Sequence, residues 1–275
     1  MSLSQPSTLT TQSFWNQFSI KTGVKFILFL FILVTHFLIL LPLIPFLKKT
    51  DLKIKRKYIL PMIQFTSTML MKVMNVKISY SGDFDIRPGT LIVCNHQSYF
   101  DLFPAIAKLR TSFICAEETA NEPFIGLIIR LAGCLLINRH NKENIEIELN
   151  KLTAHLNNGI NVVLYPESKC GDGTEIIRFR RPFFKPSVDL DEEILCMTIN
   201  YSAFNGKKVD RDNRHRVLWY RQMPVLKHFL MLLKYDQIDI DCHFQKLDPK
   251  DGDWSKQNHI ADYAHKLVSS KFRPL

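Results

Sequence analysis

The most constraining feature of this sequence is a run of 22 mostly apolar residues at positions 26–47. As a helix the run would reach about 33 Å, enough to cross the hydrocarbon core of a bilayer. It is too long for a removable signal peptide and lacks the small-residue cleavage pattern. Pro42 and Pro45 leave two alternatives open, a helix that spans the bilayer and one that turns back within one leaflet. The run predicts a membrane anchor.

Basic residues flank this run unequally. Lys21 and Lys25 precede it, and six basic residues follow it closely: Lys48, Lys49, Lys53, Lys55, Arg56 and Lys57. Because the more basic flank stays on the cytoplasmic side, the rest of the chain is expected at the cytoplasmic face of a plasma or inner membrane. His36, inside the run, has no evident partner and is interpreted as a residue that is merely tolerated there.

Composition divides the chain into three parts. Residues 1–25 form a polar tail that begins rich in Ser, Thr and Gln. Residues 26–75 form a membrane-anchoring helical region, whose second half (58–74) predicts either a helix at the membrane surface or a core helix. The remaining segment, residues 76–275, is long enough for one domain with its own core.

From Val76 onward, short β-type apolar runs alternate with helical stretches. Strands are expected at 76–80, 90–94, 112–116, 134–137, 161–165, 194–201 and 237–244. Helices are expected near 102–109, 123–131, 142–156, 224–233 and 255–271. This alternation predicts an α/β domain with a largely parallel sheet flanked by helices. Reactive groups of such domains collect beyond the carboxyl ends of the strands, where residues 95–101, 138–140 and 166–173 form three polar clusters.

The first of these clusters contains His96 and, five residues later, Asp101. Five residues of helix rotate by about 140° net, so the two side chains cannot share a helix face. They form a dyad only if His96 lies in the turn and Asp101 opens the next helix, where its carboxylate would fix the tautomer of the imidazole. A simpler interpretation makes Asp101 part of a capping box with Ser98. A second His-x4-Asp pair at His243 shows that such spacing also arises by chance.

The same cluster matches the pattern Asn-His-x-Ser-x-x-Asp in full, through Asn95, His96, Ser98 and Asp101. On this match the chain resembles the glycerolipid acyltransferases, most closely the bacterial-type 1-acyl-sn-glycerol-3-phosphate acyltransferases. Three later blocks are similar to the other motifs of the family in order and spacing: residues 133–139 (GCLLINR), 165–169 (YPESK) and 195–201 (LCMTINY). The resemblance covers about residues 55–270.

The resemblance is incomplete at two places. Ser168 and Lys169 stand where the family has Gly-Thr, and Cys196 stands where its fourth motif has proline. Because glycine permits a positive φ or a close backbone approach, Ser168 calls the shape of the third loop into question. Lys169 offers a compensating charge for phosphate.

The resemblance implies that a fatty acyl group is transferred from a thioester to the hydroxyl of a lysophospholipid, most closely 1-acylglycerol-3-phosphate, giving phosphatidate. It implies that His96 is the general base and that Asp101 orients it. Substrate-binding roles follow for Asn95, Ser98, Arg139, Glu167, Ser168 and Lys169, with Arg139 at the phosphate. Acyl-CoA or acyl-carrier protein is the expected co-substrate, and no metal or other cofactor is expected.

Charge and cysteine usage agree with a membrane-bound cytoplasmic protein. Lys plus Arg number 36 against 26 Asp plus Glu, which favours partners that bear phosphate. A nucleic acid is disfavoured, because basic and aromatic residues are not interleaved. Six widely spaced cysteines without a CxxC pair predict neither a zinc site nor disulfides. Two alternatives stay open: acylation of another lysolipid, such as a lyso-aminolipid, and a non-catalytic membrane-surface scaffold that retains the fold.

Overall fold

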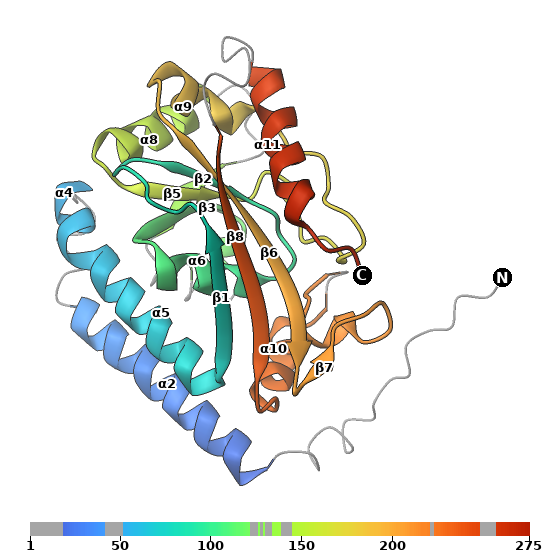
Figure 1. Ribbon diagram of the computed structural model, residues 1–275. Coiled ribbons are helices and arrows are strands. Elements are labelled where there is room, and N and C mark those ends of the chain that lie inside the picture. The colour runs from blue at the N-terminus through green and yellow to red at the C-terminus, as the bar shows by residue number, and fades with distance from the viewer. Residues whose placement is uncertain are drawn as a thin grey trace.

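The computed structural model describes residues 19–41, 52–121, 126, 129, 134–138, 145–220, 223–247 and 257–275. Its centre is an eight-stranded sheet in the order β1-β8-β6-β2-β5-β3-β4, with β7 paired to β6 (Figure 1). The strands are β1 (Val76–Gly82), β2 (Leu91–Cys94), β3 (Thr111–Ala116), β4 (Leu135–Ile137), β5 (Asn161–Leu164), β6 (Ile194–Phe204), β7 (Lys207–Lys208) and β8 (Ile238–Leu247). All seven expected strands are therefore confirmed, and only the two-residue β7 was not predicted.

The sheet is largely parallel, as the alternating pattern predicts. Parallel pairing joins β1 to β8 and links β6, β2, β5, β3 and β4 in turn. Two pairs, β6 with β8 and β6 with β7, are antiparallel. A mixed sheet of this kind is a parallel core carrying an antiparallel strand, and the fold class is confirmed.

Helices flank the sheet. The longer ones are α2 (Ile20–Leu40), α5 (Leu60–Met74), α6 (Leu102–Lys108), α8 (Ile145–Asn157), α10 (Val225–Leu233) and α11 (Gln257–Lys271). Shorter ones are α4 (Leu52–Ile54), the π-helical turn η2 (Lys55–Ile59), η3 (Tyr99–Asp101), η4 (Thr119–Asn121), η6 (Pro182–Phe184), α9 (Lys185–Asp189) and η7 (Arg214–Arg216). The helices expected near 102–109, 224–233 and 255–271 are confirmed, and that at 142–156 is described from Ile145. The one expected at 123–131 falls almost entirely outside the described residues.

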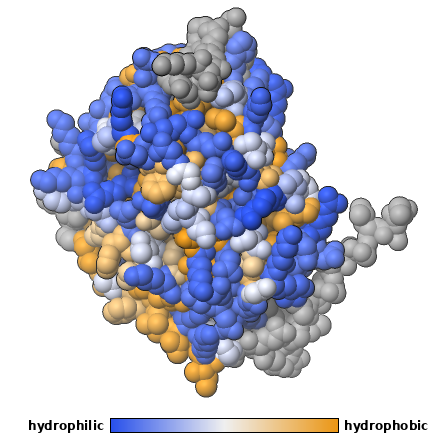
Figure 2. Space-filling model, in the orientation of Figure 1, coloured by the Kyte–Doolittle hydropathy of each residue, from blue (hydrophilic) through white to orange (hydrophobic). Residues whose placement is uncertain are grey.

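Helix α2 begins six residues before the predicted start of the apolar run. The reason is a cap, since the Ser19 hydroxyl accepts the Thr22 N–H at 3.2 Å. Residues 42–47 of the run lie outside the described part of the chain. Within that part, α2 is the one helix long and apolar enough to cross a membrane. It lies beside α5 at the lower left of the molecule (Figure 1), where apolar side chains gather at the surface (Figure 2).

Helix α5 belongs to the core on one face and to the surface on the other. Leu60, Leu70 and Met74 are buried with the sheet residues, whereas Phe65 is 65% exposed. The core interpretation of residues 58–74 is therefore confirmed for one face of this helix, and the membrane-surface interpretation stays a prediction for the exposed face. The interpretation of His36 is wrong, because it has a partner: its Nδ1 lies 2.8 Å from the Thr66 hydroxyl of α5, and the ring is buried.

A buried lysine fastens α2 to the domain. Lys25 is 7% exposed. Its ammonium group donates to the carbonyl oxygens of Tyr235 at 2.6 Å and Met74 at 3.4 Å. Four residues earlier on the same helix, Lys21 forms an exposed ion pair with Asp236. An exposed ion pair contributes little to stability. The buried contacts of Lys25 are therefore expected to stabilise the fold more than the ion pair of Lys21.

We expect Lys25→Met to lower the free energy of unfolding by about 1–3 kcal/mol, because two buried carbonyl groups lose their donor. Lys21→Met is the matched control on the same helix and should leave the stability nearly unchanged. Denaturant unfolding in detergent micelles measures both variants. Equal effects of the two substitutions would contradict the role assigned to Lys25.

Candidate active site

The first polar cluster is placed by β2. All four residues of this strand are buried, between β5 on one side and β6 on the other. Because β2, β5 and β6 are parallel, their carboxyl ends meet at the same edge of the sheet. The residues that follow β2 (95–98) therefore lie beside those that follow β5, and η3 and α6 lead the chain away.

His96 and Asp101 form a hydrogen-bonded pair at this edge. The imidazole Nδ1 lies 2.9 Å from Asp101 Oδ2, and the two side chains are 19% and 0% exposed. Since a carboxylate only accepts, Nδ1 donates, and in the neutral ring Nε2 is the acceptor. His96 lies in the turn and Asp101 in the short η3 helix, which is the arrangement on which a dyad depends.

The Asp101 carboxylate is held by three further donors. Its Oδ2 accepts the backbone N–H groups of Gln97 at 2.6 Å and Ser98 at 2.9 Å. Its Oδ1 accepts the Tyr201 hydroxyl of β6 at 2.7 Å. The capping box with Ser98 is also present. The dyad and the cap, which were alternative interpretations of the sequence, are therefore functions of one carboxylate.

Asn95 and Ser98 lie inside the protein. The Asn95 amide bonds the N–H of Ile199 at 2.7 Å and its carbonyl at 3.0 Å, joining the end of β2 to β6. The Ser98 hydroxyl accepts the N–H of Phe100 at 3.2 Å. Both side chains are buried, so the substrate contacts predicted for them are replaced by a role in positioning the turn that carries His96.

Glu167 is also an internal residue. Its two carboxylate oxygens accept the N–H groups of His96 at 2.7 Å and Ile177 at 2.8 Å. Burial raises the pKa of Glu167 to about 7, although the two N–H donors oppose the shift. The sequence predicted a contact with the acceptor head group. The structure instead shows a bridge that fixes the backbone of His96 against the third loop.

Ser168 and Lys169 follow Glu167 in that loop. Ser168 has φ 61°, the left-handed conformation that glycine adopts without cost, so the loop keeps a glycine-like shape despite the substitution. The Lys169 side chain is exposed and accessible to an anionic group. Arg139, the predicted phosphate ligand, lies outside the described residues.

The third loop packs against His96, which the sequence did not predict. Cys170 lies in this loop and is half-buried. The adjacent Gly171 N–H donates to the His96 carbonyl at 2.7 Å. The Tyr165 ring stacks on His96 with centroids 4.3 Å apart. Burial lowers the pKa of His96, but interactions with Cys170 and Asp101 outweigh it and hold the pKa well above the usual value.

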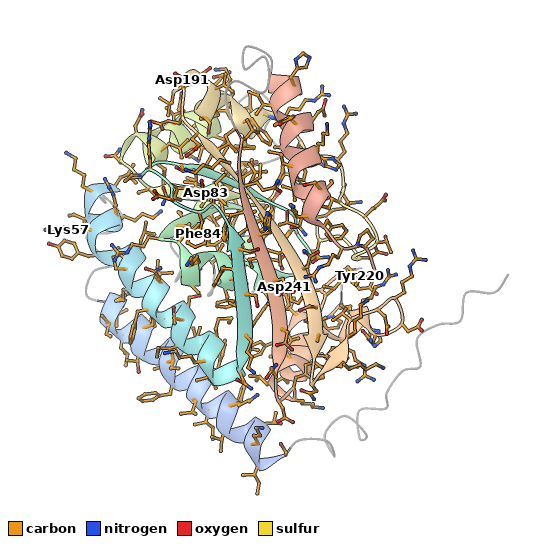
Figure 3. All side chains as sticks on the ribbon, viewed as in Figure 1. Lys57, Asp83, Phe84, Asp191, Tyr220 and Asp241 are labelled. Atoms are coloured by element: carbon orange, nitrogen blue, oxygen red, sulfur yellow. The ribbon has the colours of Figure 1, made fainter. Side chains whose placement is uncertain are left out.

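Asp101→Asn should lower the free energy of unfolding by about 3 kcal/mol, because an amide offers one acceptor and turns an NH2 group toward other donors. The control is Asp241→Asn on β8 (Figure 3), which removes only a half-exposed ion pair with Arg273. Its effect on stability should be small. Chemical denaturation followed by tryptophan fluorescence compares the two. An Asp101→Asn variant as stable as the control would show that the buried hydrogen bonds add little.

Comparisons with known proteins agree with this geometry. Residues 75–200 match the sequence model of the family described as Acyltransferase. A 1-acyl-sn-glycerol-3-phosphate acyltransferase of Neisseria gonorrhoeae is 29% identical over 123 residues, which are 45% of this chain and 48% of that protein. A lyso-ornithine lipid O-acyltransferase of Rhizobium meliloti is 23% identical over 62% of this chain and 61% of its own length.

The chain spans about half the length of the first of these curated relatives. The crystal structure of a 1-acyl-sn-glycerophosphate acyltransferase from Thermotoga maritima superimposes with a TM-score of 0.55 at 17% identity. That match covers 91% of this chain and 95% of the other, and it shows a shared fold. Residues 75–200, which hold the His96 site, are therefore similar to the Acyltransferase family.

Proposed function

We propose that this protein transfers an acyl group from acyl-CoA or acyl-carrier protein to the hydroxyl of a lysophospholipid, most closely 1-acylglycerol-3-phosphate, giving phosphatidate. The observation that supports this most directly is the bond between the His96 imidazole and the buried Asp101 carboxylate at 2.9 Å. It lies within the part of the chain that matches the Acyltransferase family.

In the proposed reaction the lysolipid hydroxyl gives its proton to Nε2 of His96 while its oxygen attacks the thioester carbonyl. The C–S bond then breaks, and the leaving thiolate takes the proton from the imidazolium. Asp101 holds the productive tautomer and stabilises the positive ring. Such general-base assistance is typically worth about 10²–10⁴ in rate.

We assign binding of the phosphate group of the lysolipid acceptor to Arg139 and Lys169. Arg139 keeps this role from the motif resemblance alone, and Lys169 is exposed after β5, at the same edge of the sheet as His96. A lyso-aminolipid is the second candidate acceptor. It is favoured by the relative from Rhizobium meliloti, whose similarity covers 62% of this chain compared with 45% for the phosphatidate-type relative. A non-catalytic scaffold has less support, because the catalytic pair is intact.

The apolar surface of the α2–α5 pair is the proposed membrane contact. Ile27, Phe31 and Leu38 on α2 and Phe65 on α5 are each more than half exposed. Figure 2 shows apolar residues gathered at the lower left of the molecule, where this helix pair lies in Figure 1. Lys57 points outward at the end of this pair (Figure 3). It also lines a cavity of about 490 Å³ together with Lys53, Arg56 and Arg110. Apolar residues bordered by cations suit the headgroup region of an anionic bilayer. The basic flank of the apolar run supports an orientation with the domain on the cytoplasmic side.

His96→Ala should abolish formation of the lipid product, because His96 is the group of the described site to which the proton of the hydroxyl is assigned. The control is His243→Ala, which alters the other His-x4-Asp pair and should leave activity intact. Both variants are assayed by mass spectrometry of the product, with a panel of lysophosphatidate, lysophosphatidylcholine and lyso-ornithine lipid. Near-normal turnover by His96→Ala would end the proposal, and the preferred lysolipid identifies the acceptor.

The dependence of rate on pH tests the protonation state of the base. The pKa of His96 is raised above its ordinary value of 6.5, so the imidazole is protonated and inactive at and below that pH. We expect kcat/KM to increase as pH rises through neutrality, with its midpoint above 6.5. A rate that is constant between about pH 5 and 9 would show that no such base limits the reaction.

A further inference from the structure

A hollow lined by four cations opens at the start of α5. Its volume is about 490 Å³, which falls within the range of small-ligand sites. The cations are Lys53, Arg56, Lys57 and Arg110, and none of the described residues that line the hollow is acidic. A cavity of this size and charge suits an anionic group.

Three of these cations share one face of a helix. Lys53, Arg56 and Lys57 are spaced i, i+3 and i+4 along the continuous segment of α4 and η2, and Leu60 at i+7 completes this face. The π-helical turn within the segment is an irregularity that often marks functional sites. Like charges at this spacing destabilise a helix, and a bound anion would remove that repulsion.

The two guanidinium groups are held in place by polar contacts. Arg56 Nη1 donates to the carbonyl oxygen of Asn158 at 3.4 Å, and Arg110 Nε donates to Gln64 Oε1 at 3.3 Å. Gly159 lets Arg56 lie against the backbone, because a Cβ atom there would stand 2.5 Å from Arg56 Nη1. Each guanidinium carries five N–H donors, so the others can bind the oxygens of a phosphate group in pairs.

The hollow lies at the opposite edge of the sheet from His96. Arg110 directly precedes β3, and Asn161, which also lines the hollow, begins β5. Strands β2, β3 and β5 are parallel, and His96 follows the carboxyl end of β2. The cations therefore surround the amino ends of these strands, and an anion bound there is separate from the proposed reaction site.

The surroundings of the hollow favour a lipid over a soluble anion. Ile54 and Tyr58, one turn apart on the same segment, are 49% and 57% exposed. The ammonium group of Lys57 lies 5.0 Å from the centre of the Tyr58 ring, so an apolar strip borders the cationic one. This combination suits the level of a bilayer at which acyl chains meet phosphate groups.

We propose that the hollow formed by Lys53, Arg56, Lys57 and Arg110 binds the phosphate group of an acidic phospholipid, as a site distinct from that of the lysolipid acceptor. The two arginines hold the phosphate oxygens, and the two lysines add charge. The acyl chains of the lipid lie along Ile54 and Tyr58. The inference adds one defined lipid to the proposed membrane contact and does not depend on the proposed acyl transfer.

The experiment titrates the full-length protein, in micelles of an uncharged detergent and without an acyl donor, by isothermal calorimetry. The probes are dihexanoylphosphatidylglycerol, the zwitterionic dihexanoylphosphatidylcholine, and inorganic phosphate as the soluble anion. The test variant combines Arg56→Lys and Arg110→Lys, which keeps the charge and removes the forked donors. The matched control is Arg87→Lys, at an exposed arginine that does not line the hollow although both of its neighbours do. Circular dichroism verifies that each variant is folded.

We expect the wild type to bind dihexanoylphosphatidylglycerol saturably and the phosphatidylcholine probe at least about tenfold more weakly. The double arginine variant should bind the phosphatidylglycerol probe about tenfold more weakly, because lysine does not form paired bonds to phosphate. Arg87→Lys should bind as the wild type does. Inorganic phosphate should compete only at higher concentration, since it has no acyl chains to bury. A diffuse attraction between charges would leave the double variant unchanged, because its net charge is unchanged.

Three results would overturn the inference: unchanged affinity of the double variant, equal affinity for the phosphatidylcholine probe, or inorganic phosphate that binds as tightly as phosphatidylglycerol. A failure of the proposed function looks different. In that case the wild type acylates no lysolipid, while the titration, which contains no acyl donor, still decides whether the hollow binds a lipid.

Discussion

The site depends on the burial of one carboxylate. Asp101 is fully removed from solvent, and an ion in that position is tolerated only when hydrogen bonds replace its water. Its four donors come from the imidazole of His96, two N–H groups of the turn, and the Tyr201 hydroxyl of β6. The need to provide the buried Asp101 carboxylate with hydrogen-bond donors thus fixes the conformation of the turn, the orientation of the His96 ring and the contact between the turn and β6.

Most of the polar residues around this carboxylate form hydrogen bonds within the protein. Asn95 joins β2 to β6, and Glu167 joins the backbone of His96 to the third loop. Ser98 caps η3. These groups are buried, so their shared effect is to hold one imidazole rigidly at the carboxyl edge of the sheet. A rigid base is what general-base catalysis on a mobile lipid alcohol requires.

Helices α2 and α5 are attached to this framework by polar contacts as well as by packing. Lys25 bonds carbonyl groups at the ends of α5 and α10, and His36 bonds Thr66 across the α2–α5 pair. The helix pair therefore has a defined orientation relative to the sheet. Because the proposed acceptor resides in the bilayer, this orientation determines how the proposed membrane contact presents the His96 edge to a lipid.

The sequence by itself determined the strands, most of the helices and the turn after β2, because apolar periodicity and turn chemistry act over a few residues. The pairing of His96 with Asp101 was implied by the family resemblance, since the spacing alone left it open. Only the tertiary structure decided which polar side chains contact one another and which remain exposed to solvent. Tyr201 contacts Asp101 across 100 residues of chain, His36 contacts Thr66 on another helix, and Glu167 of the third loop accepts the N–H of His96. Such contacts depend on how parallel strands align at one edge of the sheet, and no local pattern encodes that alignment.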